Sequence, residues 1–568
     1  MKLITEYPIN IIFDMPPVLS SSEKCSIDLE MFKMENLHLH RPTLLDGSPN
    51  GKFACLTLCW NGIDVYFITD EKDVQQALDN VKDATLVFHN AKFDVTHIRR
   101  WAYFPKRLKK FWDTMLIEQI RFSGYYDKFS LGDVVRRYLK CYIPKDVRDN
   151  FQDETELNDD LIKYSAYDCL ATWHVYKKQR EQIDRDDLNV WATIELPFLW
   201  TILGMSGIKL DVDKWTKLAL SNKEKSDELQ EKYSEINLAS PAQVKKELHK
   251  QGHKANSTGV EILEGLKDKC EFANDVLNFR TFSKRASTYG LSFIEKYVEH
   301  DGTIHSDIYQ IGAYTARTSS RNPNLQNQIS DTEYRECYIA DDEDSILCIA
   351  DWGSQEPRFA AFLSQDNKLI DALNSSEKLY IRIARDALGI NINKSDKEYT
   401  HMKSTILGIF YGMSPKGLSQ RLGVSENDAS RMINTILNTY PGIRDYINKQ
   451  RKAKDYVTSV CGRKIWLNKY SYQWERVVLN APIQSSAGDA MKISAYKVCE
   501  AWDKDFYDNT PLKLLVHDEL GAGVHKSGEQ TMARILNDIM VSVSEKLHPG
   551  ISAIADVGCA NSWADAKH

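Results

Sequence analysis

The stretch KLLVHDELGAGV, residues 513–524, places the adjacent acids Asp518 and Glu519 between two short apolar runs. This pattern predicts a β-hairpin that carries His517, Asp518 and Glu519 at its turn. An isolated His-Asp pair at such a place is most often a solvated turn. The alternative is a metal-binding carboxylate held on a rigid element, and it requires a second carboxylate from elsewhere in the chain.

The second carboxylate is Asp351. The segment SILCIAD, residues 345–351, is typical of a buried strand that ends at the aspartate, and the residues after it turn into a helix. Asp351 and Asp518 at neighbouring strand ends would hold two metal ions across a sheet edge. This arrangement suits phosphoryl transfer from a nucleoside triphosphate, because one metal activates a hydroxyl and the other neutralises pyrophosphate.

The helix predicted between Asp351 and Asp518 has a charged, an apolar and an aromatic side chain on one face. In HMKSTILGIFYGM, residues 401–413, Lys403, Leu407 and Tyr411 follow one another at intervals of four, so they share one side of the helix. A cation for phosphate, an apolar group for a base and an aromatic ring form a nucleotide platform. An apolar stripe with one lysine more often belongs to a helix that packs in the core. This segment alone therefore does not decide between a nucleotide platform and a core helix.

The composition indicates a multidomain globular protein. The chain has 568 residues, of which 42% are hydrophobic, which is ample for several packed cores. No stretch approaches the ~18 apolar residues of a membrane span, and the N-terminus lacks the apolar run of a signal peptide. Eleven cysteines without a C-x-x-C pair predict reduced thiols in the cytoplasm. The net charge of −7 is weak evidence against nucleic-acid binding, because local fields decide it.

The order of predicted elements separates the chain into regions. Residues 1 to about 185 mix strand-like and helical runs, which predicts an α/β domain. Helices dominate from about 186 to 300. A mostly helical stretch from 356 to about 505 separates the strand at 345–351 from the hairpin. A sheet interrupted in this way indicates a platform with a projecting subdomain.

The N-terminal region holds a second set of acids. Asp28 and Glu30 lie two apart in a predicted strand and therefore share a face. Asp94 falls in the first turn of a helix that we expect Asn90 to cap. Tyr164 and Asp168 are four apart on another helix. Together, the four carboxylates and the tyrosine could converge on two divalent metals for phosphodiester hydrolysis.

This pattern resembles the DEDD 3′–5′ exonucleases with a tyrosine in the third motif, through DLE, HNAKFD and YSAYD. The resemblance implies that Asp28, Glu30, Asp94 and Asp168 ligate two Mg²⁺ or Mn²⁺ ions and that Tyr164 orients the attacking water. Asp113 stands where these domains often carry Asp-Thr, and either a structural or a catalytic role is open. We interpret His38 and His40 as loop residues.

The rest of the chain resembles the family A DNA polymerases. DWGSQEPR, KSTILGIFYGM and VHDE are similar to motifs A, B and C, and AYTARTSSRNPNLQNQ and ERVVLNAPIQSSAGDAMK match two further segments. The resemblance covers essentially the whole chain. It implies an RNase H-like α/β exonuclease domain in residues 1–185 and a right-hand polymerase domain in 186–568. The latter has a helical thumb (about 200–310), an α+β palm (about 311–372 and 490–568) and helical fingers (about 373–489).

The resemblance also implies roles for individual residues. Asp351 and Asp518 are expected to bind two Mg²⁺ or Mn²⁺ ions, with Glu519 as an accessory acid. The incoming nucleotide is expected to meet Glu356, Lys403, Leu407 and Tyr411, with Glu356 and Tyr411 closing the space of a ribose 2′-hydroxyl. Arg358 is expected to bind the nucleotide at its triphosphate or to support that region. Expected DNA contacts are Arg317, Arg476, Asn480, Gln484, His517, Arg280, Lys284 and Arg285.

Two departures from the family pattern stand in motif B. Tyr399 replaces the usual arginine, so one triphosphate contact depends on Lys397, His401 or Arg385, and Leu407 replaces the usual aromatic residue. We expect a proofreading, template-directed DNA polymerase of a phage, with a trimmed repair enzyme as the alternative. It would act on primer-template DNA and dNTPs, without a 5′ nuclease domain. It is expected to be a cytoplasmic monomer with a helicase and a single-strand-binding protein as possible partners. The alternatives are an exonuclease with a degenerate polymerase half, a single-subunit RNA polymerase and a nucleic-acid scaffold.

Overall fold

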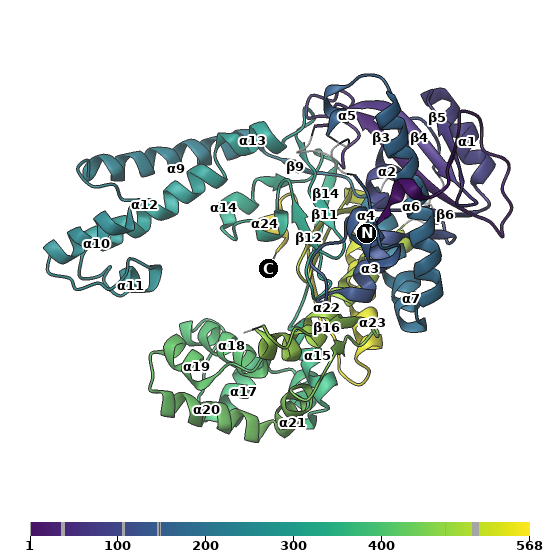
Figure 1. Ribbon diagram of the computed structural model, residues 1–568. Coiled ribbons are helices and arrows are strands. Elements are labelled where there is room, and N and C mark those ends of the chain that lie inside the picture. The colour runs from purple at the N-terminus through teal and green to yellow at the C-terminus, as the bar shows by residue number, and fades with distance from the viewer. Residues whose placement is uncertain are drawn as a thin grey trace.

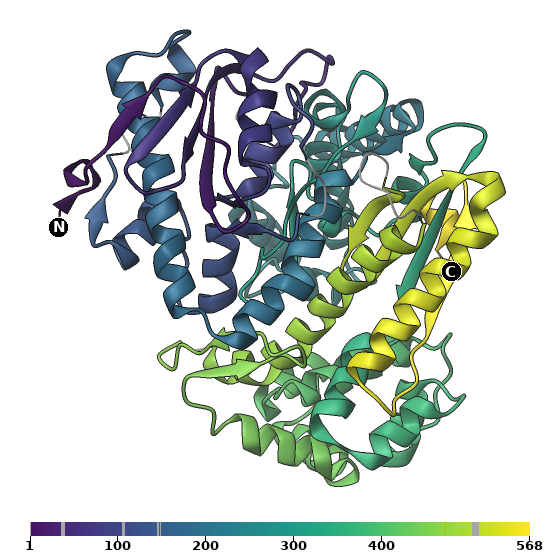
Figure 2. The same ribbon diagram turned by 90° about the vertical axis from the view of Figure 1, so that its right-hand side faces the viewer.

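The computed structural model describes residues 2–35, 40–104, 108–144, 147, 149–471, 473–502 and 510–567. Figures 1 and 2 show an N-terminal α/β unit and a C-terminal sheet from which two helical bodies extend. None of the helices within these ranges is both long and apolar enough to cross a membrane.

The N-terminal unit, residues 2–182, is built on a mixed six-stranded sheet of order β2-β5-β4-β3-β6-β7. Its strands are β2 (Asn10–Ile12), β3 (Lys24–Phe32), β4 (Lys52–Cys59), β5 (Asp64–Ile68), β6 (Thr85–Phe88) and β7 (Phe111–Asp113). Its main helices are α1 (Val74–Val81), α2 (Ala91–Ile98), α3 (Thr114–Phe122), α4 (Leu131–Tyr138) and α6 (Asp159–Gln182). In the central strand β3, buried Ile27 and Leu29 alternate with partly exposed Asp28 and Glu30, as the period of a strand requires.

The C-terminal sheet has four antiparallel strands in the order β17-β18-β14-β19. They are β17 (Leu512–Val516), β18 (Glu519–His525), β14 (Ser345–Trp352) and β19 (Ala555–Ala560). β14 therefore lies between two strands that come about 170 or more residues later in the chain. Helices α22 (Trp474–Trp502) and α23 (Glu529–Leu547) pack against each other, and α23 packs on β14 (Figure 2). The predicted strand and hairpin are both present.

The first helical body, which we call the helical arm, spans residues 212–297. It comprises α9 (Val212–Lys232), α10 (Pro241–Lys250), α11 (Val260–Glu264), α12 (Glu271–Thr288) and α13 (Leu291–Tyr297). Ser240 caps α10 by accepting from the backbone N–H of Gln243, and Pro241 follows in the first turn, where its missing N–H is not needed. The arm has a core of its own around Val244, Leu248 and Phe272.

The second helical body, the helical lobe, spans residues 367–450 and extends from the same side of the C-terminal sheet as the arm (Figure 1). It comprises α16 (Asn367–Asn374), α17 (Leu379–Leu388), α18 (Lys397–Phe410), α19 (Pro415–Leu422), α20 (Glu426–Thr439) and α21 (Pro441–Gln450). Helix α15 (Gln355–Ser364) connects it to β14. A hairpin of β15 (Tyr456–Thr458) and β16 (Lys464–Trp466) follows the lobe, within the stretch that we expected to be mostly helical.

A buried ion network ties three of these parts together. Glu195, at the end of the π-helical turn Trp191–Glu195 between the N-terminal unit and α8 (Leu196–Gly204), lies 2.5 Å from both Arg463 and Lys492. Arg463 also lies 2.7 Å from Asp489. All four side chains are fully buried, and buried charges are tolerated only when they are paired in this way.

Candidate active sites

The β17–β18 hairpin turns through two residues, because Val516 pairs with Glu519 across it. His517, the first turn residue, has a φ of 55°, a left-handed conformation that is uncommon outside glycine. The backbone N–H of Trp352 donates to the Asp518 carbonyl at 3.3 Å, which attaches the turn to the end of β14. The turn is therefore a rigid part of the sheet.

This turn brings Asp518 next to Asp351. Asp351 is the cross-strand neighbour of Glu519 on β18, so the two aspartates occupy adjacent strand ends. Partial removal of water and the negative charge of Asp351 raise the pKa of Asp518 to about 6. Two carboxylates that repel each other in this way form an oxygen-rich site suited to a hard divalent cation.

A cavity of about 480 Å³ opens in front of the two aspartates. Six separate segments contribute to it. Its lining includes Arg317, Thr318, Gln326, Asp351, Glu356, Tyr380, Lys403, Leu407, Gly488, Met491, His517 and Asp518. Seven of these residues were predicted from the sequence as nucleotide, DNA or metal contacts.

Lys403 and Leu407 reach the cavity from one face of α18, as their spacing predicts. Tyr411, one turn further, ends the helix, and its hydroxyl donates to Oε2 of Glu356. Arg317 contacts the other carboxylate oxygen of Glu356. Burial and the Glu356 charge raise the pKa of Tyr411 well above its usual range. Glu356 is thus held from both sides at the floor of the cavity.

Tyr380 is a cavity residue that the sequence did not reveal. It lies on α17, is 3% exposed, and its ring meets the ring of Tyr399 edge to face at 6.0 Å. Lys403 Nζ lies 6.0 Å from the centre of the Tyr380 ring. The position that lacks the family arginine is therefore filled by an aromatic pair. Arg385 pairs with Glu377 at 2.5 Å, and the side chain of Lys397 lies outside the described part of the chain.

Two further predicted residues serve the scaffold. Arg358 is 3% exposed and donates to the carbonyls of Gly353 and Ser552. It therefore supports the start of α15, which is the second of the two roles expected for it. Glu519 is buried and accepts from Trp563 Nε1 and Lys567. Lys567, another residue that motif reading missed, also lies 3.3 Å from Asp351.

The expected DNA contacts differ in exposure. Arg476, Asn480 and Gln484 follow one another at intervals of four on α22, but Arg476 is exposed, Gln484 is half-buried and Asn480 is buried. In the arm, Arg280 donates to Thr258 Oγ1 at 3.1 Å and to the Thr258 carbonyl, so it holds the arm together. Lys284 is exposed, and Arg285 pairs with Asp331.

In the N-terminal unit, the structure places Asp94 near Asp28. Asp94 is buried, and its Oδ1 accepts from the backbone N–H of Leu29 at 3.0 Å. Burial and the charge of Asp28 raise the pKa of Asp94 well above its ordinary value. Tyr164 and Asp168 lie on α6, which packs against β3. Among the described residues, no group of three or more His, Cys, Asp or Glu side chains is arranged to hold a metal.

Asp113 has a structural role. Its carboxylate accepts from the backbone N–H groups of Asn90, Ala91, Met115 and Leu116 at 2.7–3.2 Å. It therefore caps α3 and the start of α2 at once. Asn90 is the N-cap residue of α2, as predicted, with a φ of 70°, but its side chain makes no capping bond.

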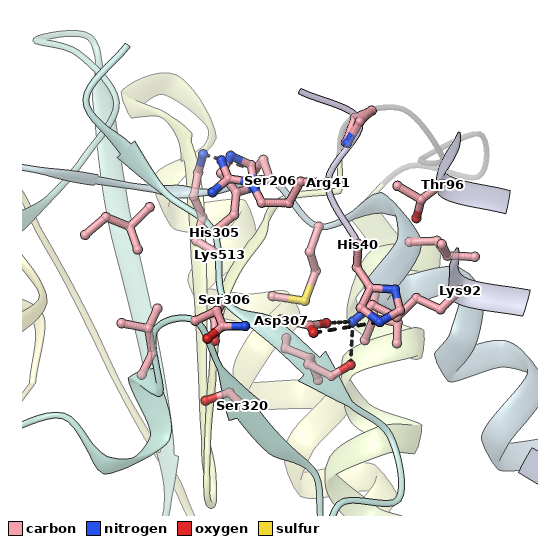
Figure 3. Close-up of a pocket in the computed structure, with 18 of the residues that line it drawn as sticks. His40, Arg41, Lys92, Thr96, Ser206, His305, Ser306, Asp307, Ser320 and Lys513 are labelled. Carbon is pink, nitrogen blue, oxygen red and sulfur yellow. Dashed lines mark hydrogen bonds and ion pairs between the residues drawn. The ribbon is translucent and has the colours of Figure 1, made fainter. Parts of the chain in front are cut away.

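A separate cavity of about 530 Å³ lies between the N-terminal unit and the base of the C-terminal sheet (Figure 3). Lys92 of α2 reaches across it to Asp307, and His40 Nε2 lies 3.8 Å from the same carboxylate. Burial and the Lys92 charge lower the pKa of His40 to about 3. His40 is therefore neutral in this cavity and belongs to the contact between the two units. His38 lies outside the described residues.

Comparison with known proteins places the chain in a family. The family model described as "DNA polymerase family A" matches residues 213–565. The chain belongs to DNA polymerase family A. A second model, described as "3'-5' exonuclease", matches residues 61–184, so this family A polymerase also carries an exonuclease domain. Both resemblances drawn from the motifs are confirmed at the level of the family.

Curated relatives named DNA polymerase I support the same assignment. The one from Chloroflexus aurantiacus is 30% identical over 431 residues, which cover 70% of this chain and 46% of that protein. The one from Treponema pallidum is 28% identical over 549 residues, which cover 89% and 54%. The chain thus spans about half the length of the curated relatives it matches.

The structure resembles the solved "POL domain of Pol1 from M. smegmatis complex with DNA primer-template and dNTP". The TM-score is 0.81 at 23% sequence identity, and the match covers 98% of this chain and all of that one. This likeness confirms the predicted fold, an exonuclease domain followed by a right-hand polymerase domain.

Proposed function

We propose that the chain is a template-directed DNA polymerase whose synthetic site is the cavity at the C-terminal sheet. The observation that carries this proposal is the pair of adjacent aspartates, Asp351 and Asp518, facing Lys403 and Leu407 across one cavity. The helical arm is the thumb, the helical lobe is the fingers, and the C-terminal sheet is the palm. Primer-template DNA and a dNTP are the substrates.

The donor set of this site fits divalent metal ions. Two carboxylates and the substrate phosphates are the ligands that Mg²⁺ prefers. When bound, two Mg²⁺ or Mn²⁺ ions would activate the primer 3′-hydroxyl and stabilise the pyrophosphate leaving group. Asp351 and Asp518 would hold them.

The other cavity residues would orient the substrates. Lys403 is exposed at the cavity and would bind the triphosphate as a point charge. Glu356, fixed by Tyr411 and Arg317, would occupy the space of a ribose 2′-hydroxyl. His517 projects from the hairpin turn and would contact the primer terminus. Arg317, in contact with Glu356, would do the same from the other side.

We also propose proofreading in the N-terminal unit. Asp28, Glu30, Asp94 and Asp168 would bind two metal ions of the same kind, and Tyr164 would orient the water that attacks the terminal phosphodiester. The packing of α6 on β3 and the effect of the Asp28 charge on Asp94 support this assignment. The expected replication of a phage genome, the monomeric state and the helicase and single-strand-binding partners stay predictions.

Primer extension with a labelled primer, a template, Mg²⁺ and either dNTPs or rNTPs tests the polymerase. Asp351→Asn and Asp518→Asn should each abolish extension while DNA binding persists. The matched control is Asp556→Asn, because Asp556 pairs with Asp351 on the other neighbouring strand and does not line the cavity. Near-normal extension by Asp518→Asn would refute the assignment.

The same assay separates the alternatives. Extension only with rNTPs would indicate an RNA polymerase. Degradation of single strands without any extension would indicate that the Tyr399 replacement marks a degenerate polymerase half. If the folded protein shows neither extension nor degradation, a nucleic-acid scaffold is the remaining interpretation.

A further inference from the structure

Two cysteines face each other across neighbouring strands of the C-terminal sheet. Cys348 of β14 and Cys559 of β19 are direct cross-strand partners in the antiparallel register. Their sulfur atoms lie 2.7 Å apart. Directly opposed residues in antiparallel strands have Cα atoms about 4.5–5.5 Å apart, which falls within the range that a disulfide spans.

The two thiols differ in access to solvent. Cys348 is fully buried beneath α23, whereas Cys559 is partly exposed on the edge strand. Nine of the eleven cysteines are buried, and only Cys461 shares the partial exposure of Cys559. A reagent in solution therefore reaches this pair through Cys559.

The pKa values of the two thiols also favour reaction at Cys559. The hydrogen bond with Cys348 lowers the pKa of Cys559. That bond and burial raise the pKa of Cys348. The more exposed sulfur is thus the better thiolate, and the thiolate is the species that attacks a disulfide.

We propose that Cys348 and Cys559 are a redox modification site that forms a reversible cross-strand disulfide within the palm. This inference goes beyond the proposed polymerase activity. It requires an oxidant, and the chemical class is a low-molecular-weight disulfide such as oxidised glutathione.

The reaction proceeds in two exchanges. The Cys559 thiolate attacks one sulfur of the small disulfide, forms a mixed disulfide and releases one small thiolate. Cys348, 2.7 Å away, then gives up its proton and attacks the Cys559 sulfur, which releases the second small thiolate. Two protein thiols are oxidised by two electrons, and one small disulfide is reduced to two thiols.

The position of the pair predicts what the bond does. Side chains alternate along a strand, so Cys348 lies on the opposite face of β14 from Asp351. Cys348, Ala350 and Trp352 pack in one core, whereas Leu347 and Ile349 pack in another. The disulfide therefore forms on the α23 side, away from the substrate cavity. It would link the edge strand β19 to β14 through two cysteines that are 211 residues apart in the sequence. Such a link restricts the conformations of the unfolded chain.

The test is incubation of the full chain with reduced or oxidised glutathione, followed by alkylation under denaturing conditions and peptide mapping. Oxidation of the wild type should remove two of the eleven thiols and yield one cross-linked peptide pair containing residues 348 and 559. The melting temperature should rise on oxidation and return on reduction. Primer extension should proceed at the same rate in both states.

Three variants make the outcome decisive. Cys348→Ser should accumulate a mixed disulfide with one glutathione at Cys559, because the resolving thiol is gone. Cys559→Ser should show no modification at residue 348. Cys461→Ser, the control for a partly exposed cysteine without this partner, should form the cross-link like the wild type. Absence of the 348–559 peptide pair after oxidation, or equal stability of both states, would overturn the proposal.

Discussion

The Tyr411 hydroxyl at the end of α18 donates a hydrogen bond to Oε2 of Glu356, a residue 55 positions earlier at the start of α15. Arg317 contacts the second oxygen of the same carboxylate. Glu356 cannot turn away from the cavity without breaking both contacts. Its position is therefore suited to excluding a bulkier sugar.

Glu356→Ala should accordingly admit ribonucleotides. Removal of the carboxylate opens space beside the sugar, and we expect the rNTP/dNTP ratio of insertion efficiencies to rise by roughly tenfold or more. Tyr411→Phe keeps the ring and removes only the hydrogen bond, so it should give a smaller rise. Single-nucleotide insertion measures both, and an unchanged ratio in Glu356→Ala would exclude this role.

Leu407 should make the enzyme reject dideoxynucleotides. Leucine offers only apolar contact near the sugar, whereas a tyrosine hydroxyl can partly replace an absent 3′-hydroxyl. One hydrogen bond of ~1–2 kcal/mol corresponds to roughly tenfold in selectivity, so Leu407→Tyr should raise the ddNTP/dNTP ratio by that order.

Leu407→Phe is the control for this experiment, because it adds the same ring without the hydroxyl. It should leave the ratio near that of the wild type. The comparison uses ratios of insertion efficiency, since a larger ring costs ~1–3 kcal/mol when it overpacks and lowers overall activity. Equal ratios in the wild type and Leu407→Tyr would show that Leu407 is not at the nucleotide sugar.

Proofreading should be separable from synthesis. The double substitution Asp28→Ala with Glu30→Ala removes two carboxylates from β3, and we expect 3′–5′ degradation of single strands to disappear while primer extension continues. Asp79→Ala, an exposed acid on α1 of the same unit, should leave both activities unchanged. Residual degradation by the purified double variant would contradict the site.

The stability of the metal-free enzyme should depend on the protonation of Asp518. Its pKa of about 6 lies above its ordinary value of 3.8, so the folded state binds this proton more tightly than the unfolded chain. The resulting cost to stability is absent below about pH 4, grows as the pH rises and is complete above about pH 6.

Asp518→Asn removes that cost. In buffer containing EDTA, the variant should melt at a higher temperature than the wild type near neutral pH, and the difference should shrink towards about pH 4. The matched control is Asp556→Asn, which replaces an exposed aspartate that does not line the cavity. A difference in melting temperature that does not vary with pH would contradict the predicted repulsion.

The buried network should contribute far more to stability than a surface ion pair. Arg463→Met leaves Glu195 and Asp489 buried with a single cation, and we expect a loss of ~3–5 kcal/mol in the free energy of unfolding. Arg451→Met removes an exposed ion pair, in which Arg451 Nη2 lies 2.6 Å from Glu475 Oε1. This substitution should lower the free energy of unfolding by about 1 kcal/mol or less. Urea denaturation measures both, and similar losses in the two variants would contradict this view.

Much of the polymerase site could be predicted because its residues follow regular periods. Asp351 and Asp518 end predicted strands, and Lys403, Leu407 and Tyr411 repeat at helical spacing. Tyr380 and Lys567 could not be found in this way. Tyr380 belongs to an ordinary amphipathic helix, and Lys567 meets Asp351 and Glu519 only through tertiary contacts.

The differences between prediction and structure also have physical causes. The motif leaves two roles open for Arg358, and the carbonyls of Gly353 and Ser552 satisfy its guanidinium, which favours the supporting role. The Asp113 carboxylate on β7 caps α2. The sequence around Asn90 does not reveal this contact, because Asp113 belongs to a different strand. The β15–β16 hairpin was missed because its strands are only three residues long.

The position of Glu195 constrains how such enzymes can be recombined. A chimera that exchanges the N-terminal unit must join the chains before the π-helical turn Trp191–Glu195, for example at the exposed loop near Asp184. A later junction would place a foreign residue opposite Arg463 and Lys492, so that Lys492 would lose its ion-pair partner and Arg463 would keep only Asp489. A chimera should therefore keep the polymerase half together with the π-helical turn Trp191–Glu195 that precedes it.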